Sequence, residues 1–116
     1  MTSEAAAPTG ADVTNTNQLW LRLDEWGDQP LLICMVDEGI LGRDFRSDVV
    51  VHDSEASRMH ARVTPTFDGW LVVDLSTTNG TFVNSERIVG PAVIGIGDVI
   101  AVGRATCTVV PAPPQR

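Results

Sequence analysis

The stretch Ala61-Arg-Val-Thr-Pro-Thr-Phe-Asp-Gly-Trp-Leu-Val-Val-Asp-Leu75 decides the fold class of this chain. Two segments rich in β-branched and aromatic residues flank the pair Asp68-Gly69, and this composition is typical of strands. An Asp-Gly pair supplies the positive backbone φ angles that a two-residue type I′ turn needs. The stretch therefore predicts a β-hairpin with Asp68 and Gly69 as its turn.

Short strand-like segments continue on both sides of this hairpin, and no window shows the periodicity of an amphipathic helix. Glycine and aspartate separate the segments at close intervals, as in all-β domains. The sequence therefore predicts an all-β fold, a two-sheet sandwich of about eleven short strands whose loops at one end carry function. The other expected strand segments are 19–23, 30–36, 40–43, 49–51, 81–84 and 106–110. Residues 94–102 alternate apolar residues with Gly95 and Gly97-Asp98, which predicts one more tight connection there.

The length of 116 residues suits one domain with a single core. Residues 1–17 are mostly small and polar, so we expect a disordered tail there. The sandwich is expected over residues 18–110. Residues 111–116 are rich in proline, which predicts an extended end or the start of a linker.

The charge of the chain limits its partners. Its net charge is -7, and all eight basic residues are arginine. Nucleic acids and anionic membrane surfaces require many cationic contacts, so we expect neither as a partner. No apolar run is long enough for a membrane span, and residues 1–16 lack the features of a signal peptide. We therefore expect a cytoplasmic protein without membrane insertion.

Three short polar motifs on predicted loops carry the candidate binding chemistry. An arginine offers a planar fork of donors, a serine a neutral donor, and an asparagine both a donor and an acceptor. This combination suits a phosphate group attached to a peptide backbone. The motifs are Gly42-Arg43, Ser57-Arg58-Met59-His60, and Thr78-Asn79-Gly80-Thr81 followed by Val83-Asn84.

In this order and spacing the three motifs closely resemble the signature of the forkhead-associated (FHA) domain family, and the strand pattern from Leu19 to Val110 agrees with that family. The resemblance implies an eleven-stranded sandwich that binds a phosphothreonine peptide with the loops at one end. It also implies a partner that is a phosphorylated kinase or kinase substrate. Neither a cofactor nor catalytic activity is expected.

The resemblance assigns roles to individual residues. Arg43 matches the phosphate-binding arginine, Ser57 the phosphate-contacting hydroxyl, and Asn79 the asparagine that holds the peptide backbone. Arg58 and Thr78 match positions that often add contacts to the phosphate. The residues expected to shape the loops are Gly42, His60, Gly80 and Asn84; the chain departs from the common pattern at Ser85, where a glycine often follows the asparagine.

Catalytic and metal sites have little support in the sequence. Ser57 and His60 are three residues apart, but no nucleophile elbow or oxyanion motif accompanies them. His52, His60 and the two cysteines lack the spacing of metal ligands, so no metal site is expected. Cys34 and Cys107 each lie in an apolar segment, which predicts buried free thiols without a disulfide.

Other interpretations remain open from the sequence. Arg43 can form a surface ion pair with Asp44 or Asp48, and Ser57 and Asn79 can simply bond their own backbone. The domain can also be a structural sandwich that binds proteins without phosphate, or an accessory domain of a larger enzyme.

The N-terminal tail suggests a further hypothesis. Phosphorylation of Thr9, Thr14 or Thr16 would create an intramolecular ligand for Arg43 at high effective concentration. Such a contact would block the binding of an outside partner.

Overall fold

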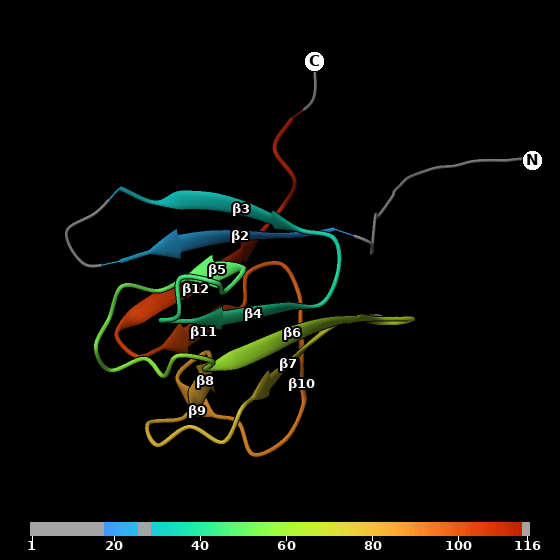
Figure 1. Cartoon of the computed structure of the whole chain (residues 1–116). Coiled ribbons are helices and arrows are strands. Elements are labelled where there is room, and N and C mark those ends of the chain that lie inside the picture. The colour runs from blue at the N-terminus through green and yellow to red at the C-terminus, as the bar shows by residue number, and fades with distance from the viewer. Residues whose placement is uncertain (1–17, 26–28, 115–116) are drawn as a thin grey trace, which may run out of the picture.

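The computed structural model describes residues 18–25 and 29–114, and this part of the chain forms eleven strands in two packed sheets (Figure 1). The expected all-β sandwich is confirmed. In the described ranges no helix is long and apolar enough to cross a membrane. The expected tail over residues 1–17 lies outside the described residues, and residues 111–114 form no strand.

The strand order defines the two layers. One sheet has the order β10-β7-β6-β4-β5, and the other has the order β3-β2-β12-β11-β8-β9. Neighbouring strands run antiparallel, except β4 and β5, which are parallel. The first sheet contains β4 (Gly39–Gly42), β5 (Val49–Val50), β6 (Ala61–Thr66), β7 (Gly69–Asp74) and β10 (Ala92–Ile94). The second contains β2 (Leu19–Asp24), β3 (Leu31–Met35), β8 (Thr81–Val83), β9 (Glu86–Arg87), β11 (Val99–Val102) and β12 (Ala105–Val110).

Alternating side chains from both sheets build the core. Along β2 the residues Leu19, Leu21 and Leu23 are buried, while the residues between them face outward. This period of two is what a sheet with one covered face requires. The core opposite β2 includes Leu41 and Val63 from the other sheet, both fully buried. The packed layers hold the strand ends, and therefore the loops, in fixed positions.

The hairpin of β6 and β7 is confirmed, but its predicted turn is wrong. Thr66 pairs with Gly69, so the two loop residues are Phe67 and Asp68. Neither has a positive φ, as a type I′ turn would need, and only Gly69 does, with φ 130. The Thr66 hydroxyl donates a hydrogen bond to the Gly69 carbonyl oxygen over 2.8 Å. This local bond closes the turn around Phe67 and Asp68, in place of the predicted type I′ turn at Asp68 and Gly69.

Two consecutive positive φ values occur instead at Asn84 and Ser85, with φ 52 and 73, between β8 and β9. Asparagine tolerates this region better than most residues, and Ser85 occupies it without a glycine. Strand β9 was not predicted, because its two residues, Glu86 and Arg87, are charged and exposed.

The two cysteines lie in different surroundings, and both are free. Cys107 is buried as predicted, and burial raises the pKa of its thiol to about 12. The prediction that Cys34 is buried is wrong, since its side chain is exposed. Cys34 belongs to β3, which pairs with β2 alone among the described strands and lies at the edge of its sheet. An apolar run does not reveal whether its strand lies at an edge.

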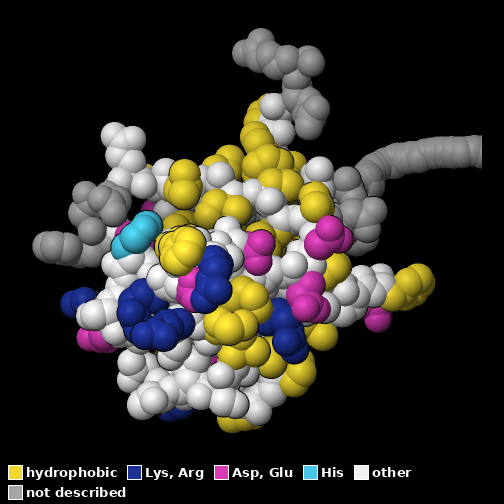
Figure 2. Space-filling view, viewed as in Figure 1, with side chains coloured by type: hydrophobic (Ala, Val, Ile, Leu, Met, Phe, Trp, Pro, Cys, Tyr) yellow, Lys and Arg dark blue, Asp and Glu magenta, His cyan; other side chains and the backbone are white. Residues whose placement is uncertain are grey.

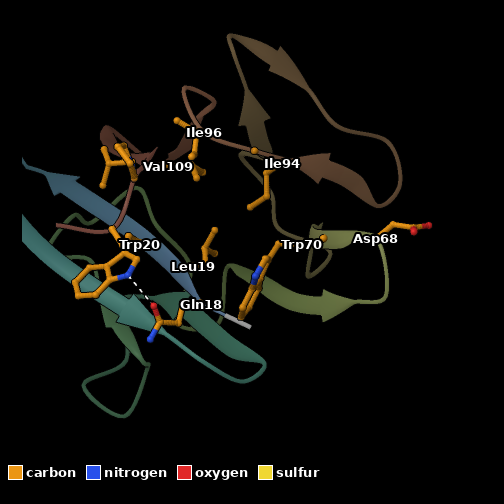
Figure 3. A pocket seen from close by; sticks show the side chains of 13 residues that line it. Gln18, Leu19, Trp20, Asp68, Trp70, Ile94, Ile96 and Val109 are labelled. Carbon is orange, nitrogen blue, oxygen red and sulfur yellow. Dashed lines mark hydrogen bonds between the residues drawn. The ribbon is translucent and has the colours of Figure 1, made fainter. Parts of the chain in front are cut away.

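The direction of the strands divides the loops between two ends of the sandwich. β4 and β7 end, and β6 begins, at the same end, so residues 43–48, 51–60 and 75–80 form loops there (Figure 1). The opposite end holds an apolar cavity of about 500 Å³. Trp20, Trp70, Ile94 and Val109 surround that cavity (Figure 3). The polar motifs and the cavity are therefore separated by the length of the strands.

Candidate functional site

Arg43 directly follows β4 and is tied to the loop that contains Ser57. Its backbone N–H donates to the carbonyl oxygen of Ser57 over 2.9 Å, and its Nε donates to that of Ala56 over 2.9 Å. The residue is exposed and its guanidinium is anchored through Nε, while in the described part of the chain its terminal nitrogens have no hydrogen-bond partner. This arrangement presents donors to an anion without leaving the arginine free to rotate.

Gly42 allows the two loops to approach. A Cβ atom at this position would lie 2.0 Å from the carbonyl oxygen of Arg58, which is far inside a van der Waals contact. The Arg58 carbonyl also accepts a hydrogen bond from the backbone N–H of Asp44 over 3.1 Å. The close approach of these backbones therefore requires glycine.

The acidic neighbours of Arg43 bind other groups. Asp44 pairs with Arg46 through two contacts of 3.2 and 2.9 Å, and these hydrogen bonds lower the pKa of Asp44 to about 2. Asp48 accepts a hydrogen bond from the backbone N–H of Ile40 over 2.8 Å. Among the described residues no carboxylate pairs with Arg43. The surface ion pair considered from the sequence does not form in this structure.

Ser57 is half-buried and held by its backbone. Its N–H donates to Nδ1 of His60 over 3.0 Å, and its carbonyl oxygen accepts from Arg43. In the described part of the chain its hydroxyl has no hydrogen-bond partner. The Arg58 side chain next to it is exposed. The hydroxyl of Ser57 and the guanidinium of Arg43 are thus donors on two loops joined by backbone bonds.

His60 joins these loops to the third motif. Its imidazole is fully buried, with Nδ1 accepting from Ser57 and Nε2 donating to the carbonyl oxygen of Gly80 over 2.8 Å. The neutral ring with its hydrogen on Nε2 satisfies both bonds. His60 therefore has a structural part in the site and offers no free nitrogen to a substrate.

A network around Asp74 shapes the third loop. This carboxylate accepts from the backbone N–H of Thr77 over 3.0 Å, from the Thr77 hydroxyl over 2.6 Å and from the Thr81 hydroxyl over 2.7 Å. The Thr77 hydroxyl in turn accepts from the backbone N–H of Gly80 over 2.9 Å. Neither Asp74 nor Thr77 was among the candidate site residues predicted from the sequence. An Asp followed three residues later by Thr is a local turn signal that points to them.

Asn79 connects the third loop with the second. Its Nδ2 donates to the carbonyl oxygen of Glu55 over 2.9 Å, and its side chain is otherwise exposed. Thr78 is also exposed, and its carbonyl oxygen lies 3.4 Å from an Nη atom of Arg87. The structure thus brings Arg43, Ser57, Arg58, Thr78 and Asn79 onto three linked loops at one end.

Asp53 and Arg104 form a further anchor of the loops, and neither residue was predicted as a site residue from the sequence. Asp53 is buried and accepts hydrogen bonds from the backbone of Glu55 and from both the backbone and the guanidinium of Arg104. The backbone bond from Glu55 and the contacts with Arg104 lower the pKa of Asp53, although burial opposes them. The two residues lie 51 positions apart, so no local signal reveals the pair.

Asn84 lies apart from the other motif residues. Its Nδ2 donates to Asp98 over 3.0 Å, and its Oδ1 accepts from the backbone N–H of Val99 over 3.0 Å. These bonds fasten the turn after β8 to the start of β11. Within the described ranges no cluster of three or more His, Cys, Asp or Glu residues is arranged to hold a metal ion.

Comparisons with known proteins agree on one family. A family model of the FHA domain matches residues 39–103. The FHA domain-containing protein FhaB of Mycolicibacterium smegmatis is 33% identical over 85 residues, which cover 73% of this chain and 50% of FhaB. The chain therefore spans about half the length of that relative.

Solved structures show the same fold. The FHA domain of the CT664 protein from Chlamydia trachomatis superposes with a TM-score of 0.75 at 23% identity, covering 83% of this chain and 99% of that one. An FHA domain solved in a study of phosphothreonine-dependent interactions superposes with a TM-score of 0.70 at 27% identity, covering 84% and 99%.

The Asp74 network predicts a pH-dependent contribution to stability. Burial raises the pKa of Asp74, but hydrogen bonds from Thr77 and Thr81 outweigh burial and hold it below its ordinary value. A lowered folded-state pKa means that the stabilisation is complete above about pH 5 and is lost as pH falls through the folded-state pKa. Asp74→Asn should therefore lower the free energy of unfolding at neutral pH by about 1–2 kcal/mol.

Urea unfolding of both proteins at about pH 7 and about pH 3 tests this prediction, and the difference between them should shrink at the lower pH. Asp68→Asn is the matched control, because Asp68 lies exposed at the tip of the β6–β7 hairpin. A difference that stays constant with pH would contradict the role given to the Asp74 carboxylate.

Proposed function

The chain belongs to the FHA domain family, and we propose that it is a non-catalytic phosphothreonine-binding module that mediates phosphorylation-dependent protein interactions in Ser/Thr kinase signalling. The observation that carries the proposal is the set of donors from Arg43, Ser57 and Asn79 on three loops that hydrogen bonds lock together. These side chains are presented at one end of a rigid sandwich. Binding a phosphopeptide requires donors that are held in place and does not require a catalytic group.

The chemistry of the three side chains suits the proposed ligand. A phosphothreonine carries about -1.5 to -2 charges and three strong acceptor oxygens. The terminal nitrogens of Arg43 can meet two of these oxygens, and the Ser57 hydroxyl can donate to a third. The amide of Asn79 then pairs with the backbone of the bound peptide. Arg58 and Thr78 flank this arrangement and extend the proposed site.

Local charge explains how an acidic chain can bind an anion. The net charge of -7 repels phosphate at long range. Figure 2 shows basic side chains gathered at the loop end of this face. The two acids close to Arg43 in the sequence bind other groups, since Asp44 pairs with Arg46 and Asp48 accepts a backbone hydrogen bond. We therefore expect recognition to depend on short-range contacts, with the long-range repulsion weakened by salt.

The proposed partner is a phosphothreonine-containing protein, a kinase or a kinase substrate. The FHA domain studied for phosphothreonine-dependent interactions supports this choice of ligand. The proposal includes no nucleic acid, membrane insertion, metal, cofactor or catalytic step. A cytoplasmic location is part of the proposal, and two free thiols, one of them exposed, suit a reducing compartment.

The first test is Arg43→Ala. We expect this variant to lose about 2–5 kcal/mol of binding free energy for a phosphothreonine peptide, because the phosphate loses its charged partner. Ser57→Ala and Asn79→Ala should each lose less, since they remove uncharged donors. Isothermal titration calorimetry with each purified variant measures these losses.

Arg22→Ala is the matched control, because Arg22 pairs with Asp24 on β2 and, among the described residues, shares no hydrogen bond or ion pair with the three loops. Its affinity should equal that of the unaltered chain. Equal affinity in the Arg43→Ala variant, with a native amide spectrum, would refute the site. A partner that binds equally well without phosphate would favour the structural-sandwich interpretation.

A second prediction concerns the phosphorylated residue. Phosphoserine lacks the γ-methyl group of phosphothreonine, and one buried methyl contributes about 0.8 kcal/mol. A peptide with phosphoserine should therefore bind several-fold more weakly than the matched phosphothreonine peptide. Calorimetry on the two peptides compares them directly, and identical affinities would show that no methyl pocket is present.

The tail hypothesis stays a prediction, because Thr9, Thr14 and Thr16 lie outside the described residues. β2 begins at the end of the sandwich opposite the polar loops, so a folded-back tail must cover about 20 Å, the length of a six-residue strand. Ten extended residues before Leu19 reach at most about 36 Å, whereas three reach about 11 Å. Phosphorylated Thr9 can therefore reach Arg43, but phosphorylated Thr16 cannot.

Chains phosphorylated at one of these threonines would test the hypothesis. Phosphorylation at Thr9 should shift the amide signals of Arg43, Ser57 and Asn79 and weaken the binding of an added phosphopeptide. Phosphorylation at Thr16 should change neither. An unshifted spectrum after modification of Thr9 would exclude closure by the tail.

A further inference from the structure

Arg87 lies against the third polar loop, although no motif in the sequence draws attention to it. Its side chain covers Gly80, since a Cβ atom added to Gly80 would lie 2.4 Å from Nε of Arg87. An Nη atom of Arg87 donates to the carbonyl oxygen of Thr78 over 3.4 Å. One arginine therefore contacts both ends of the Thr78-Asn79-Gly80 segment.

The β8–β9 hairpin places this arginine. Arg87 pairs with Phe82, and the N–H of Ile88 donates to the carbonyl oxygen of Thr81 over 3.0 Å. Asn84 fastens the intervening turn to β11. The turn thus directs the chain back toward the loop it has just left. This geometry connects Asn84, which lies away from the polar loops, to the binding end of the molecule.

Gly80 is consequently held from two directions. Its carbonyl oxygen accepts from the buried ring of His60, and its Cα lies under the side chain of Arg87. In the part of the chain that the structure describes, no carboxylate lies within ion-pair distance of Arg87. Its positive charge therefore stays unneutralised beside Thr78 and Asn79.

We infer that Arg87 is a positioning residue for peptide recognition, which holds the Thr78-Asn79 segment in the conformation that grips the peptide backbone. This inference rests on the proposed function, because it assigns Asn79 to the bound peptide. Arg87 acts through the loop and is not a ligand of the phosphate. The main phosphate donors of the proposed site are Arg43 and Ser57, which the other two loops supply.

The difference between peptide and phosphate provides the test. Arg87→Met removes the charge and the donors but keeps a long side chain over Gly80. We expect this variant to bind a phosphothreonine peptide about tenfold more weakly, because the bond to the Thr78 carbonyl is charge-assisted. Its affinity for inorganic phosphate, followed at the amide signals of Arg43 and Ser57, should stay within about twofold of the unaltered chain, because Arg87 shares no hydrogen bond with the described loops that carry these two residues and the loss of one surface charge is largely screened.

Two further variants make the test specific. Arg87→Lys keeps the charge and a donor for Thr78, so it should regain most of the lost affinity. Arg22→Met removes a charge elsewhere on the surface and should leave both affinities unchanged. Without ligand, the Gly80 amide should exchange with solvent faster in Arg87→Met than in Arg22→Met, because the segment has lost a contact.

The outcomes separate this inference from the proposed function. If the unaltered chain does not bind the phosphothreonine peptide, both are overturned. If it binds and Arg87→Met binds equally well, only the inference is overturned. Equal losses for the peptide and for inorganic phosphate would show that Arg87 acts by charge alone and would also overturn it. A lysine variant as weak as the methionine variant would exclude the hydrogen-bonding role.

Discussion

The buried imidazole of His60 is the contact on which the geometry of the polar loops depends. It accepts from the backbone of Ser57 and donates to the backbone of Gly80, so the two loops that carry these residues share one ring. A buried donor or acceptor without a partner costs about 1–3 kcal/mol, and both ring nitrogens are satisfied here. The backbone of His60 is also bonded, to Leu41 and Leu75. The ring and the main chain of His60 together attach the loops to β4 and to the residue that follows β7.

The polar residues of the site fall into two groups: some hold the loop backbone in place, and others are exposed and available to a ligand. Asp53 and Asp74 accept hydrogen bonds from within the loops, and each has a pKa below its ordinary value. These two carboxylates hold the loop backbone. The exposed side chains of Arg43 and Asn79 therefore keep most of their polar atoms available for a ligand. Each side chain is anchored by one hydrogen bond to a backbone carbonyl, and its other polar atoms have no partner among the described residues. A binding module gains from this division, since pre-ordered donors lose less entropy when a ligand binds.

The two ends of the sandwich differ in polarity. Because the strands alternate in direction, the connecting loops are divided between these two ends. The polar loops gather where β4 and β7 end, whereas the opposite end is apolar and is lined by Trp20 and Trp70 (Figure 3). The β8–β9 hairpin contacts the polar loops through Arg87, which lies against Thr78 and Gly80. It is also tied to β11 through Asn84. Support for the third loop therefore comes from the second sheet as well as from its own strands.

The sequence by itself determined the class of fold, the order of most strands and the residues that meet at the polar end. These features follow from local properties: side-chain alternation, turn residues and the spacing of three motifs. The tertiary structure decided which turn adopts two positive φ angles, because bonds from Asn84 to Asp98 and Val99 hold the turn at Asn84 and Ser85. It also decided that Cys34 is exposed, since β3 lies at a sheet edge. The pairing of Asp53 with Arg104 and the contact of Arg87 with Gly80 depend on which strands lie side by side. Sheet order brings such residues together, and periodicity along one strand does not say which other strand lies beside it.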